Sequence, residues 1–508
     1  MEILCPYCCS RFQADQVHFR LIGPLEDVVE EKEEIAEEDS LSNTVGRQRS
    51  TRKQSKNENT GKMLDERLYN YYKEYLNNEA AARQDAMQFG YVEFDVMNAE
   101  IDYNRQELRE YGYVNKIKYR NQELTTRLCP NCHKNLISSA GKYPMYMFSV
   151  IGDTNVGKSI YLTVLEAMIE MGGIDASMFF VGTKEERDYY RAANKRVMQD
   201  RRMLTATIGK VPPLTFEFKY SVKDEYAQTQ TNTALITFCD IPGEMCRDRE
   251  NLEIFGSHLR ASSGLMFLID PTRFRRVRNI IDQGAEIDER YQKDVIEALN
   301  SFLVADSHEK FLGIPTAIII TKSDTLKVIP YFLESEAHSY LVSDPKWNDR
   351  HANFVDESEI QEIHRGVSEF MNSMDEREYL RKFEKTFANY RYFINSALGH
   401  APAKDETDDD IIIIKEKIRD AVITPYRVTE AFYWLLAENS VLPRNMTKKY
   451  RNTKTKEERT LSFLYYKNYD QKYIDQKTEA LRARHKIKDS LLGGNWELQK
   501  PDQPSGKE

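Results

Sequence analysis

A run of eight residues has the types and the spacing of a phosphate-binding loop. It follows an apolar run, opens a helix-forming segment and reads G-x-x-x-x-G-K-S. The glycines let the backbone curl so that successive N–H groups face an anion, and the following helix adds partial positive charge at its N-terminus. The segment comprises Gly152, Asp153, Thr154, Asn155, Val156, Gly157, Lys158 and Ser159, with Ile160 as the next helical residue. We expect Lys158 to bridge the β- and γ-phosphates of a nucleotide and Ser159 to bind Mg²⁺; the alternative is a glycine-bearing turn with an exposed lysine.

An acidic residue at the end of a later apolar run fits the same chemistry. The run 234–239 ends in Asp240, and Gly243 follows three residues on. A carboxylate at that strand end can hold Mg²⁺ through water, and a glycine N–H placed there can meet the γ-phosphate. The pattern D-x-x-G is common by itself, so its weight comes from its position after the loop.

Two more segments predict which base is bound. Thr321, Lys322 and Asp324 follow the apolar run 316–320. The Asp324 carboxylate can accept two hydrogen bonds from guanine N1–H and its exocyclic amine, a donor pair that adenine lacks. We expect Lys322 to lay its stem against the purine and the loop. Another apolar run leads into Ser396, Ala397 and Leu398, where the Ala397 amide can meet guanine O6.

Four cysteines have the pattern of a metal site. Cys5 and Cys8 form one Cys-Pro-x-Cys turn, and Cys129 and Cys132 form a second. Such turns point thiolates and backbone N–H groups at one metal, and four thiolates close a tetrahedral structural Zn²⁺ site. The pairs lie too far apart for a simple ribbon, so the intervening chain must be an insertion. Two isolated thiol pairs are the alternative.

These candidate residues follow apolar runs of strand length that alternate with helical stretches. The runs are 146–151, 214–220, 234–239, 264–269, 316–320 and 392–395, and the helical stretches are 159–171, 184–200, 294–303, 357–374 and 429–438. This alternation predicts an α/β fold with a mostly parallel sheet covered by helices on both faces. Ligands in such sheets bind at the carboxyl ends of the strands, where the candidate residues fall.

The chain divides into four parts. Residues 1–22 and 127–144 form the split zinc ribbon, residues 23–126 hold an acidic linker and a helical and strand-like insertion, residues 145–440 form the α/β domain, and residues 441–508 form a basic tail. In the tail, basic residues alternate with tyrosines. They fit either a nucleic-acid surface or, as we favour, a solvated helix whose tyrosines pack on the main domain.

Composition excludes several classes of protein. The 508 residues carry 72 Lys and Arg against 81 Asp and Glu, a net charge of −9 that disfavours wholesale nucleic-acid binding. No apolar run approaches the roughly 18 residues needed to cross a bilayer. The N-terminus lacks the basic and apolar regions of a secretory signal, and the seven cysteines are too few for a disulfide scaffold in a chain of this length. We therefore expect a cytoplasmic protein.

With the motifs in this order, residues 146–438 resemble the P-loop GTPases. Within that superfamily the chain is similar to the bacterial double-GTPase type 2 group, which has two Cys-Pro-x-Cys pairs before the phosphate loop, an Asp-x-Pro-Gly-Glu switch and a Trp-bearing final helix. The last two features correspond here to 240–244 and to Trp434 with the two leucines after it. The resemblance implies a P-loop GTPase-like fold, GTP and GDP as ligands, GTP hydrolysis, and a place in a bacterial conflict or signalling system.

Three positions relate to this family in different ways. Glu244 stands where well-known GTPases carry a water-positioning Gln, and a carboxylate there is repelled by the γ-phosphate, so we expect it to contact Mg²⁺-bound water or another switch residue. Thr207 is our candidate for the switch I threonine, chosen over Thr205 and Thr215. Asn155 stands where potassium-stimulated GTPases hold a monovalent cation, so K⁺ is a candidate cofactor; the alternative is an Asn suited to the loop's backbone geometry.

The sequence thus predicts a Mg²⁺-dependent GTPase that turns over slowly without a partner. In-line attack by water is the expected reaction, with Lys158, Thr207 and Glu244 as the catalytic candidates. A protein partner is expected to bind the zinc ribbon or the insertion. Two alternatives stay open: a nucleotide-binding scaffold with little turnover, and a nucleic-acid-binding effector that uses the ribbon and the basic tail.

Overall fold

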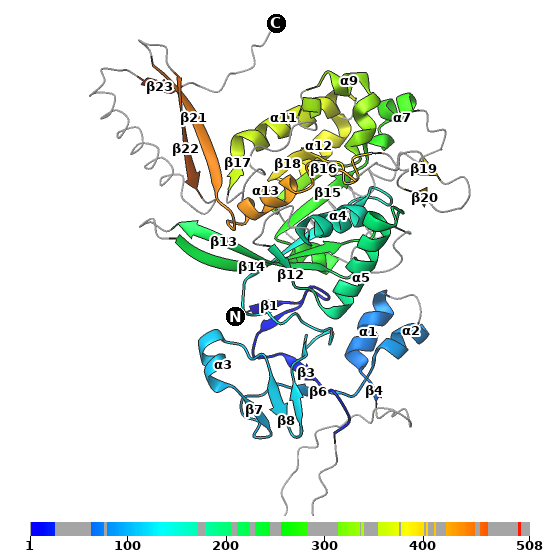
Figure 1. The fold of residues 1–508 in the computed structure, drawn as a ribbon, viewed down its shortest axis with the longest axis vertical. Coiled ribbons are helices and arrows are strands. Elements are labelled where there is room, and N and C mark those ends of the chain that lie inside the picture. Colours follow the sequence, from blue (N-terminus) through cyan, green and yellow to red (C-terminus); the bar gives the residue numbers. More distant parts are fainter. Residues whose placement is uncertain are drawn as a thin grey trace, which may run out of the picture. The chain divides into compact units, whose positions relative to one another are not determined.

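The computed structural model describes sixteen segments of the chain, which are residues 2–25, 62–75, 79–170, 178–204, 211–223, 229–243, 256–281, 313–335, 337–339, 354–374, 377–400, 403–404, 411–412, 423–452, 458–465 and 496–498. They belong to two compact units, Met1–Tyr143 and Pro144–Glu508 (Figure 1). The expected helix at 294–303 and the acidic run after residue 25 lie outside the described residues.

The second unit is built on a seven-stranded sheet with the order β12-β13-β14-β11-β15-β16-β18. Its strands are β11 (Met145–Ile151), β12 (Met178–Phe180), β13 (Leu214–Lys223), β14 (Thr229–Asp240), β15 (Gly264–Ile269), β16 (Thr316–Ile320) and β18 (Tyr390–Ile394). The pairs from β14 through β11, β15 and β16 to β18 are parallel, whereas β12 and β13 join antiparallel. The predicted α/β class with a mostly parallel sheet is confirmed.

Burial explains why the central strands form. Every residue of β15 and of β16 is buried, as expected for strands that have a helical layer on each face. Short strands of this kind contribute side chains to both faces in alternation. Adjacent residues of one strand therefore show which helix covers which face.

Ring contacts from one strand identify the two helical layers. On β18, Phe393 lies 5.8 Å from Trp434 of α13 (Glu430–Glu438), measured between ring centroids, whereas the adjacent Tyr392 stacks on His364 of α11 (Glu357–Ser373) at 5.2 Å. Since neighbours on a strand point to opposite faces, α13 and α11 cover opposite sides of the sheet. Helix α12 (Arg377–Thr386) joins α11, because its Phe383 ring also contacts Tyr392.

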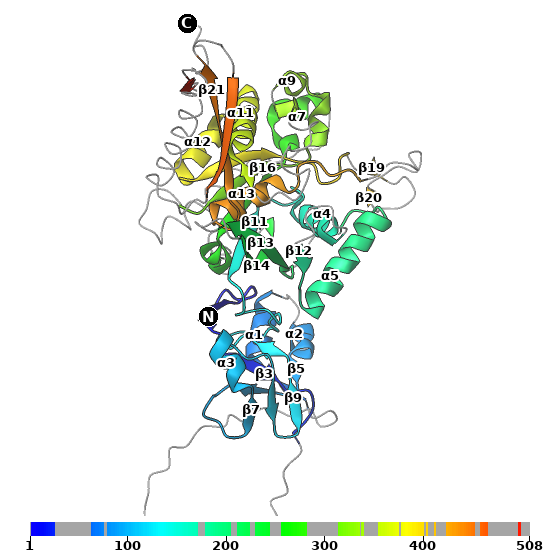
Figure 2. The same cartoon turned by 60° about the vertical axis from the view of Figure 1, so that its left-hand side comes forward.

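Helix α13 is buried on all sides, as a helix inside a core must be. All nine of its residues are buried, and Phe432 contacts the rings of Phe148 on β11 and Phe238 on β14. Helix α4 (Lys158–Glu170) contacts the residues just before α13, because the Tyr161 hydroxyl donates to the Val428 carbonyl at 2.6 Å. Figure 2 shows α4 and α5 (Lys184–Asn194) on one side of the sheet and α11 and α12 on the other.

The first unit consists of short strands and helices. Its central sheet joins β3 (His18–Arg20) to β10 (Arg127–Leu128) and β6 (Tyr91–Glu93), all antiparallel. A hairpin, β1 (Glu2–Leu4) and β2 (Arg11–Gln13), precedes it. A three-stranded meander of β7 (Ile101–Tyr103), β8 (Ile117–Tyr119) and β9 (Gln122–Leu124) carries α3 (Arg105–Tyr111), which Asn104 and Gly112 cap. Strands β4 (Met63–Leu64) and β5 (Met87–Gln88) flank α1 (Glu66–Tyr75) and α2 (Glu79–Asp85).

The tail corrects one expectation. We favoured a helix after residue 441, but β21 (Arg444–Asn452) and β22 (Glu458–Tyr465) form an antiparallel hairpin, and β23 (Trp496–Leu498) adds to it. Strand β21 also pairs in parallel with β17 (Val355–Asp356), which stands before α11. Cross-strand pairing satisfies the backbone here and outweighs the local preference for a helix. Among the described helices, none is long and apolar enough to cross a membrane.

Candidate functional site

The phosphate loop needs glycine where it leaves the sheet. Gly152 has a φ of 147°, and a Cβ there would lie 2.6 Å from the Leu268 carbonyl oxygen of β15. Only glycine fits such a backbone without a clash. The loop then turns through Asn155, whose φ of 62° is left-handed, and enters α4 at Lys158. The predicted strand–loop–helix arrangement is therefore present.

Five successive carbonyls of the loop, from residue 152 to residue 156, accept hydrogen bonds from side chains. Lys158 Nζ donates to the carbonyls of Gly152 and Asp153, at 3.0 Å each. Arg273 donates to the Thr154 carbonyl, Lys322 Nζ to that of Asn155 at 2.7 Å, and Thr321 Oγ1 to that of Val156 at 2.9 Å. Fixing the carbonyls fixes the peptide planes, and so fixes the direction of the loop's N–H groups.

The two expected Mg²⁺ ligands lie in contact. Ser159 Oγ donates to Asp240 Oδ2 at 2.7 Å, joining the start of α4 to the end of β14. Oxygen donors of this kind suit Mg²⁺, which keeps several waters and takes few protein ligands. Tyr189 of α5 belongs to the same surroundings, since burial and then the Asp240 charge raise its pKa to about 12.

Gly243 lies directly against the phosphate loop. A Cβ at this position would meet the Thr154 nitrogen at 2.4 Å and the Asp153 carbonyl carbon at 2.5 Å. The D-x-x-G segment therefore approaches the loop as closely as backbone can, and only glycine allows it. The two other switch candidates, Thr207 and Glu244, lie outside the described residues.

The segments predicted to read a base meet each other. Ser396 Oγ donates to Asp324 Oδ1 at 2.5 Å, and the Gly399 amide donates to Ser396 Oγ at 2.9 Å. Lys322 has a left-handed φ of 49° and ion-pairs with Asp270 at 2.7 Å. Ala397 is half-buried and Leu398 is buried. All these groups follow the carboxyl ends of parallel strands, the edge at which such sheets bind ligands.

Sequence reasoning missed Asp270 and Arg273. Both lie in a short turn after β15, where η3 spans Pro271–Arg273. The sequence could have indicated only where these residues lie. They follow the apolar run that forms β15, and the carboxyl end of β15 reaches the same sheet edge as those of β11 and β16. No motif includes these residues, and the contacts of Arg273 to the loop span more than a hundred positions.

The four cysteines predicted to bind zinc form one cluster in the first unit. Their Sγ atoms lie within 4.8 Å of one another, with Cys5–Cys132 and Cys8–Cys129 at 3.7 Å. Four sulfurs at about 2.3 Å from a tetrahedral Zn²⁺ are about 3.8 Å apart, so the donor set fits this ion. Burial raises the pKa of the Cys5 and Cys132 thiols, so four thiolates need a cation to coexist.

The two cysteine turns repeat the same backbone pattern. The amide of the first Cys donates to a carbonyl five residues later, from Cys5 to Ser10 and from Cys129 to Lys134, at 3.0 Å each. The fifth residue of each turn, Cys9 or His133, has a left-handed φ and donates back to the first Cys carbonyl at 2.9 Å. Cys9 and His133 therefore shape the turns, and neither belongs to the sulfur cluster.

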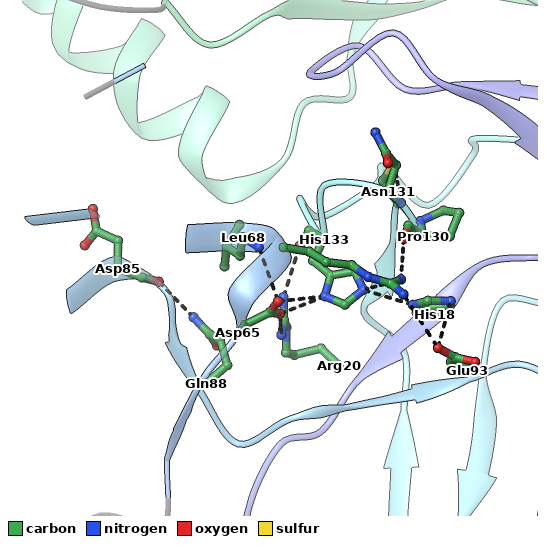
Figure 3. A network of polar contacts seen from close by, with 12 residues as sticks. His18, Arg20, Asp65, Leu68, Asp85, Gln88, Glu93, Pro130, Asn131 and His133 are labelled. Atoms are coloured by element: carbon green, nitrogen blue, oxygen red, sulfur yellow. Dashed lines mark hydrogen bonds and ion pairs between the residues drawn. The ribbon is translucent and has the colours of Figure 1, made fainter. Parts of the chain in front are cut away.

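A buried polar network lies beside the second cysteine turn (Figure 3). His133 Nδ1 lies 2.8 Å from Asp65 Oδ1, and Arg20 ion-pairs with Asp65 Oδ2 at 2.6 Å. His133 Nε2 faces His18 Nδ1 at 3.0 Å, and Arg67 donates to the Pro130 carbonyl. Burial lowers the pKa of His18 to about 3, so its ring is neutral. The network joins the start of α1 to the cysteine turn.

The strand order supplies the assignment of the second unit. An antiparallel edge precedes a parallel run, the phosphate loop follows the central strand β11, and the Asp240 and Asp324 segments follow β14 and β16. The second unit has a P-loop GTPase-like α/β fold. The Cys₄ cluster fits a zinc ribbon.

Comparison with known proteins adds solved structures of GTPases. No protein-family model matches the sequence, and no curated protein does. The GTP-bound GTPase-like domain of Ski7 from S. cerevisiae matches with a TM-score of 0.26 and 13% identity, over 63% of this chain and 58% of that one. The small GTPase Arl6 BBS3 from Trypanosoma brucei, with bound GppNp, has a TM-score of 0.24 and 10% identity, over 59% and 99%. A bacterial selenocysteine-specific elongation factor has values of 0.21 and 11%, over 64% and 35%.

The P-loop GTPase fold thus rests on this chain's own strand order and loop. This chain spans less than two thirds of the Ski7 domain that it matches. Membership of the double-GTPase type 2 group stays a prediction.

Proposed function

We propose that the chain is a Mg²⁺-dependent GTP-binding protein that hydrolyses GTP to GDP and phosphate. The observation that carries the proposal is a convergence at one sheet edge. The phosphate loop, the Ser159–Asp240 pair and the Asp324–Ser396 pair all follow carboxyl ends of strands in one sheet. Each group alone has a structural explanation, whereas together they match the triphosphate, the Mg²⁺ ion and the base of a bound nucleotide.

Triphosphate binding would use the loop amides and Lys158. The Lys158 ammonium now bonds the carbonyls of Gly152 and Asp153, so it is held at the loop and needs only to turn toward an incoming anion. The start of α4 adds the partial positive charge of a helix N-terminus. The loop therefore favours a polyanion without any change in its backbone.

Mg²⁺ would be held by Ser159 and Asp240. Their side chains already lie within hydrogen-bond distance of each other, and a hydroxyl with a carboxylate is the oxygen donor pair expected for this ion. When bound, Mg²⁺ neutralises charge on the β- and γ-phosphates. The Gly243 backbone, which lies against Thr154, would stand on the γ-phosphate side.

Guanine selection would fall to Asp324. Ser396 holds one of its carboxylate oxygens, which orients the group before any base arrives. An ionised carboxylate accepts hydrogen bonds only, so it matches the two donors of guanine and repels the acceptor N1 of adenine. Lys322, fixed by Asp270 and the Asn155 carbonyl, would cover the purine.

Hydrolysis would use switch residues that lie outside the described part of the chain. Thr207 and Glu244 stay as the proposed switch residues, and K⁺ beside Asn155 stays a proposed cofactor. The slow intrinsic rate, a cytoplasmic location and a protein partner on the ribbon or insertion are likewise proposals, and a role in a bacterial conflict or signalling system is a proposal from the family resemblance. They concern regulation and context and leave the chemistry of the site unchanged.

Single-turnover cleavage of GTP tests the proposal. We expect the full chain to cleave GTP in preference to ATP, and Lys158→Ala to lower the rate by roughly 100-fold or more, because a cation on the transferred charge is lost. Lys184→Ala, at the exposed start of α5, is the matched control and should retain the wild-type rate. Cleavage of ATP at the same rate would contradict guanine selection. Tight GTP binding without cleavage would instead favour the nucleotide-binding scaffold.

A further inference from the structure

The phosphate loop contains a buried carboxylate that opposes its proposed ligand. Asp153 is 2% exposed, and its Oδ1 accepts from the Thr154 amide at 2.7 Å and from the Thr154 hydroxyl at 3.2 Å. Those contacts shape the first turn of the loop. A negative charge in this position would nevertheless repel a triphosphate bound to the same loop. The inference that follows rests on the proposed function.

Arg273 supplies the opposing charge from another part of the chain. One guanidinium nitrogen, Nη1, contacts Asp153 Oδ2, and the other, Nη2, donates to the Thr154 carbonyl. The side chain of Arg273 is 12% exposed and that of Asp153 is 0% exposed, so the pair is shielded from water and salt. The planar guanidinium holds the carboxylate and the carbonyl through two different nitrogens in a fixed geometry.

The turn that carries Arg273 is itself held in place. Asp270 Oδ1 accepts from the Thr272 amide at 2.9 Å and from its hydroxyl at 2.7 Å, while Asp270 Oδ2 pairs with Lys322 at 2.7 Å. Pro271 follows the cap, where its fixed φ suits the turn. One four-residue segment therefore holds two cations, Arg273 and Lys322, against the adjacent carbonyls of Thr154 and Asn155.

We propose that Arg273 is a positioning residue that neutralises Asp153 and fixes the first half of the loop for a polyphosphate. It acts through the loop, because its two terminal nitrogens, Nη1 and Nη2, contact Asp153 and the Thr154 carbonyl. The pair makes the loop electrically neutral at a point where the anion must approach. GTP and GDP should benefit alike, because each places a phosphate chain in the loop.

A double-mutant cycle on nucleotide affinity tests this role. We expect Arg273→Met to weaken binding of both fluorescent GTP and fluorescent GDP by roughly 10- to 100-fold, the usual effect of leaving one member of a buried charge pair alone. Adding Asp153→Asn removes the stranded charge and should restore affinity to within roughly threefold of that of Asp153→Asn alone. Arg276→Met, an exposed arginine on the next helix, should bind as the wild type does.

Three results would overturn the assignment. They are unchanged affinity in Arg273→Met, a double variant no better than Arg273→Met, and a loss confined to GTP, which would mean contact with the terminal phosphate. The same variants can be compared by thermal unfolding of the nucleotide-free protein. Arg273→Met should lower the unfolding midpoint, and adding Asp153→Asn should restore it. If the wild type binds no guanine nucleotide, the proposed function fails, and the unfolding cycle still decides whether Arg273 neutralises Asp153.

Discussion

The phosphate loop and the cysteine cluster prepare their binding groups in opposite ways. The loop is one continuous segment whose carbonyls are held by several side chains, each through one or two hydrogen bonds. The cluster joins two distant turns through four equivalent sulfurs. The loop should therefore lose function by degrees as contacts are removed, whereas the cluster should fail as a whole.

Loss of one cysteine should have the largest effect. Cys129→Ser leaves three thiolates, and since metal binding in small zinc domains contributes about 10 kcal/mol or more to folding, we expect the metal to be lost and the first unit to unfold. Metal content and hydrogen exchange in α1 measure this directly. Helix α4 in the second unit should keep its protection and its nucleotide binding.

The neighbouring thiol is the control for this experiment. Cys9 has the left-handed backbone of its turn and lies outside the sulfur cluster, so Cys9→Ser should retain one zinc per chain. Removal of metal by a chelator should reproduce the Cys129→Ser pattern. If the first unit kept its hydrogen-exchange protection after losing zinc, the view that the cysteine cluster fails as a whole would be wrong.

The polar network beside the cluster offers the next largest effect. Arg20→Met removes the cationic partner of the buried Asp65 carboxylate, which Arg20 contacts at 2.6 Å, and breaking a buried ion pair in this way costs about 3–5 kcal/mol. Arg11→Met removes an exposed pair with Glu2 in the same unit and should cost at most about 1 kcal/mol. Chemical unfolding of both variants with zinc bound gives the two values. Similar losses would show that the network contributes no more than a surface contact.

Base selectivity should depend on a single side chain of the second unit. Asp324→Asn replaces one acceptor oxygen with a donor, so it mismatches guanine and no longer repels N1 of adenine. We expect the preference for GTP over ATP to fall by roughly 100-fold, with the thermal midpoint of the nucleotide-free protein little changed. Competition between the two nucleotides measures this, and Asp188→Asn, at an exposed position of α5, is the matched control. An unchanged preference would remove Asp324 from the base site.

The same contrast explains what could be predicted from the sequence. The loop, Asp240, Asp324 and the cysteine pairs were identifiable because each motif is local and its strand or turn context is readable nearby. Asp270 and Arg273 act on the loop from far along the chain, and the pairing of His133 with Asp65 depends on how the insertion folds. The tail hairpin was missed because strand pairing is non-local and overrides local propensity. Thr207 and Glu244 stay predictions.

The smallest expected effect tests the graded side of the comparison. Thr321 Oγ1 lies 2.9 Å from the Val156 carbonyl and 3.1 Å from that of Ile269, and one hydroxyl proton serves one of them at a time. Thr321→Val therefore removes about 1 kcal/mol of support, which should weaken nucleotide binding only about fivefold. Thr386→Val, which removes an equally buried hydroxyl bonded within α12, should lower stability to a similar extent and leave the affinity unchanged. A complete loss of binding in Thr321→Val would contradict the view that the loop is held by many small contacts, since one hydroxyl would then carry most of the support.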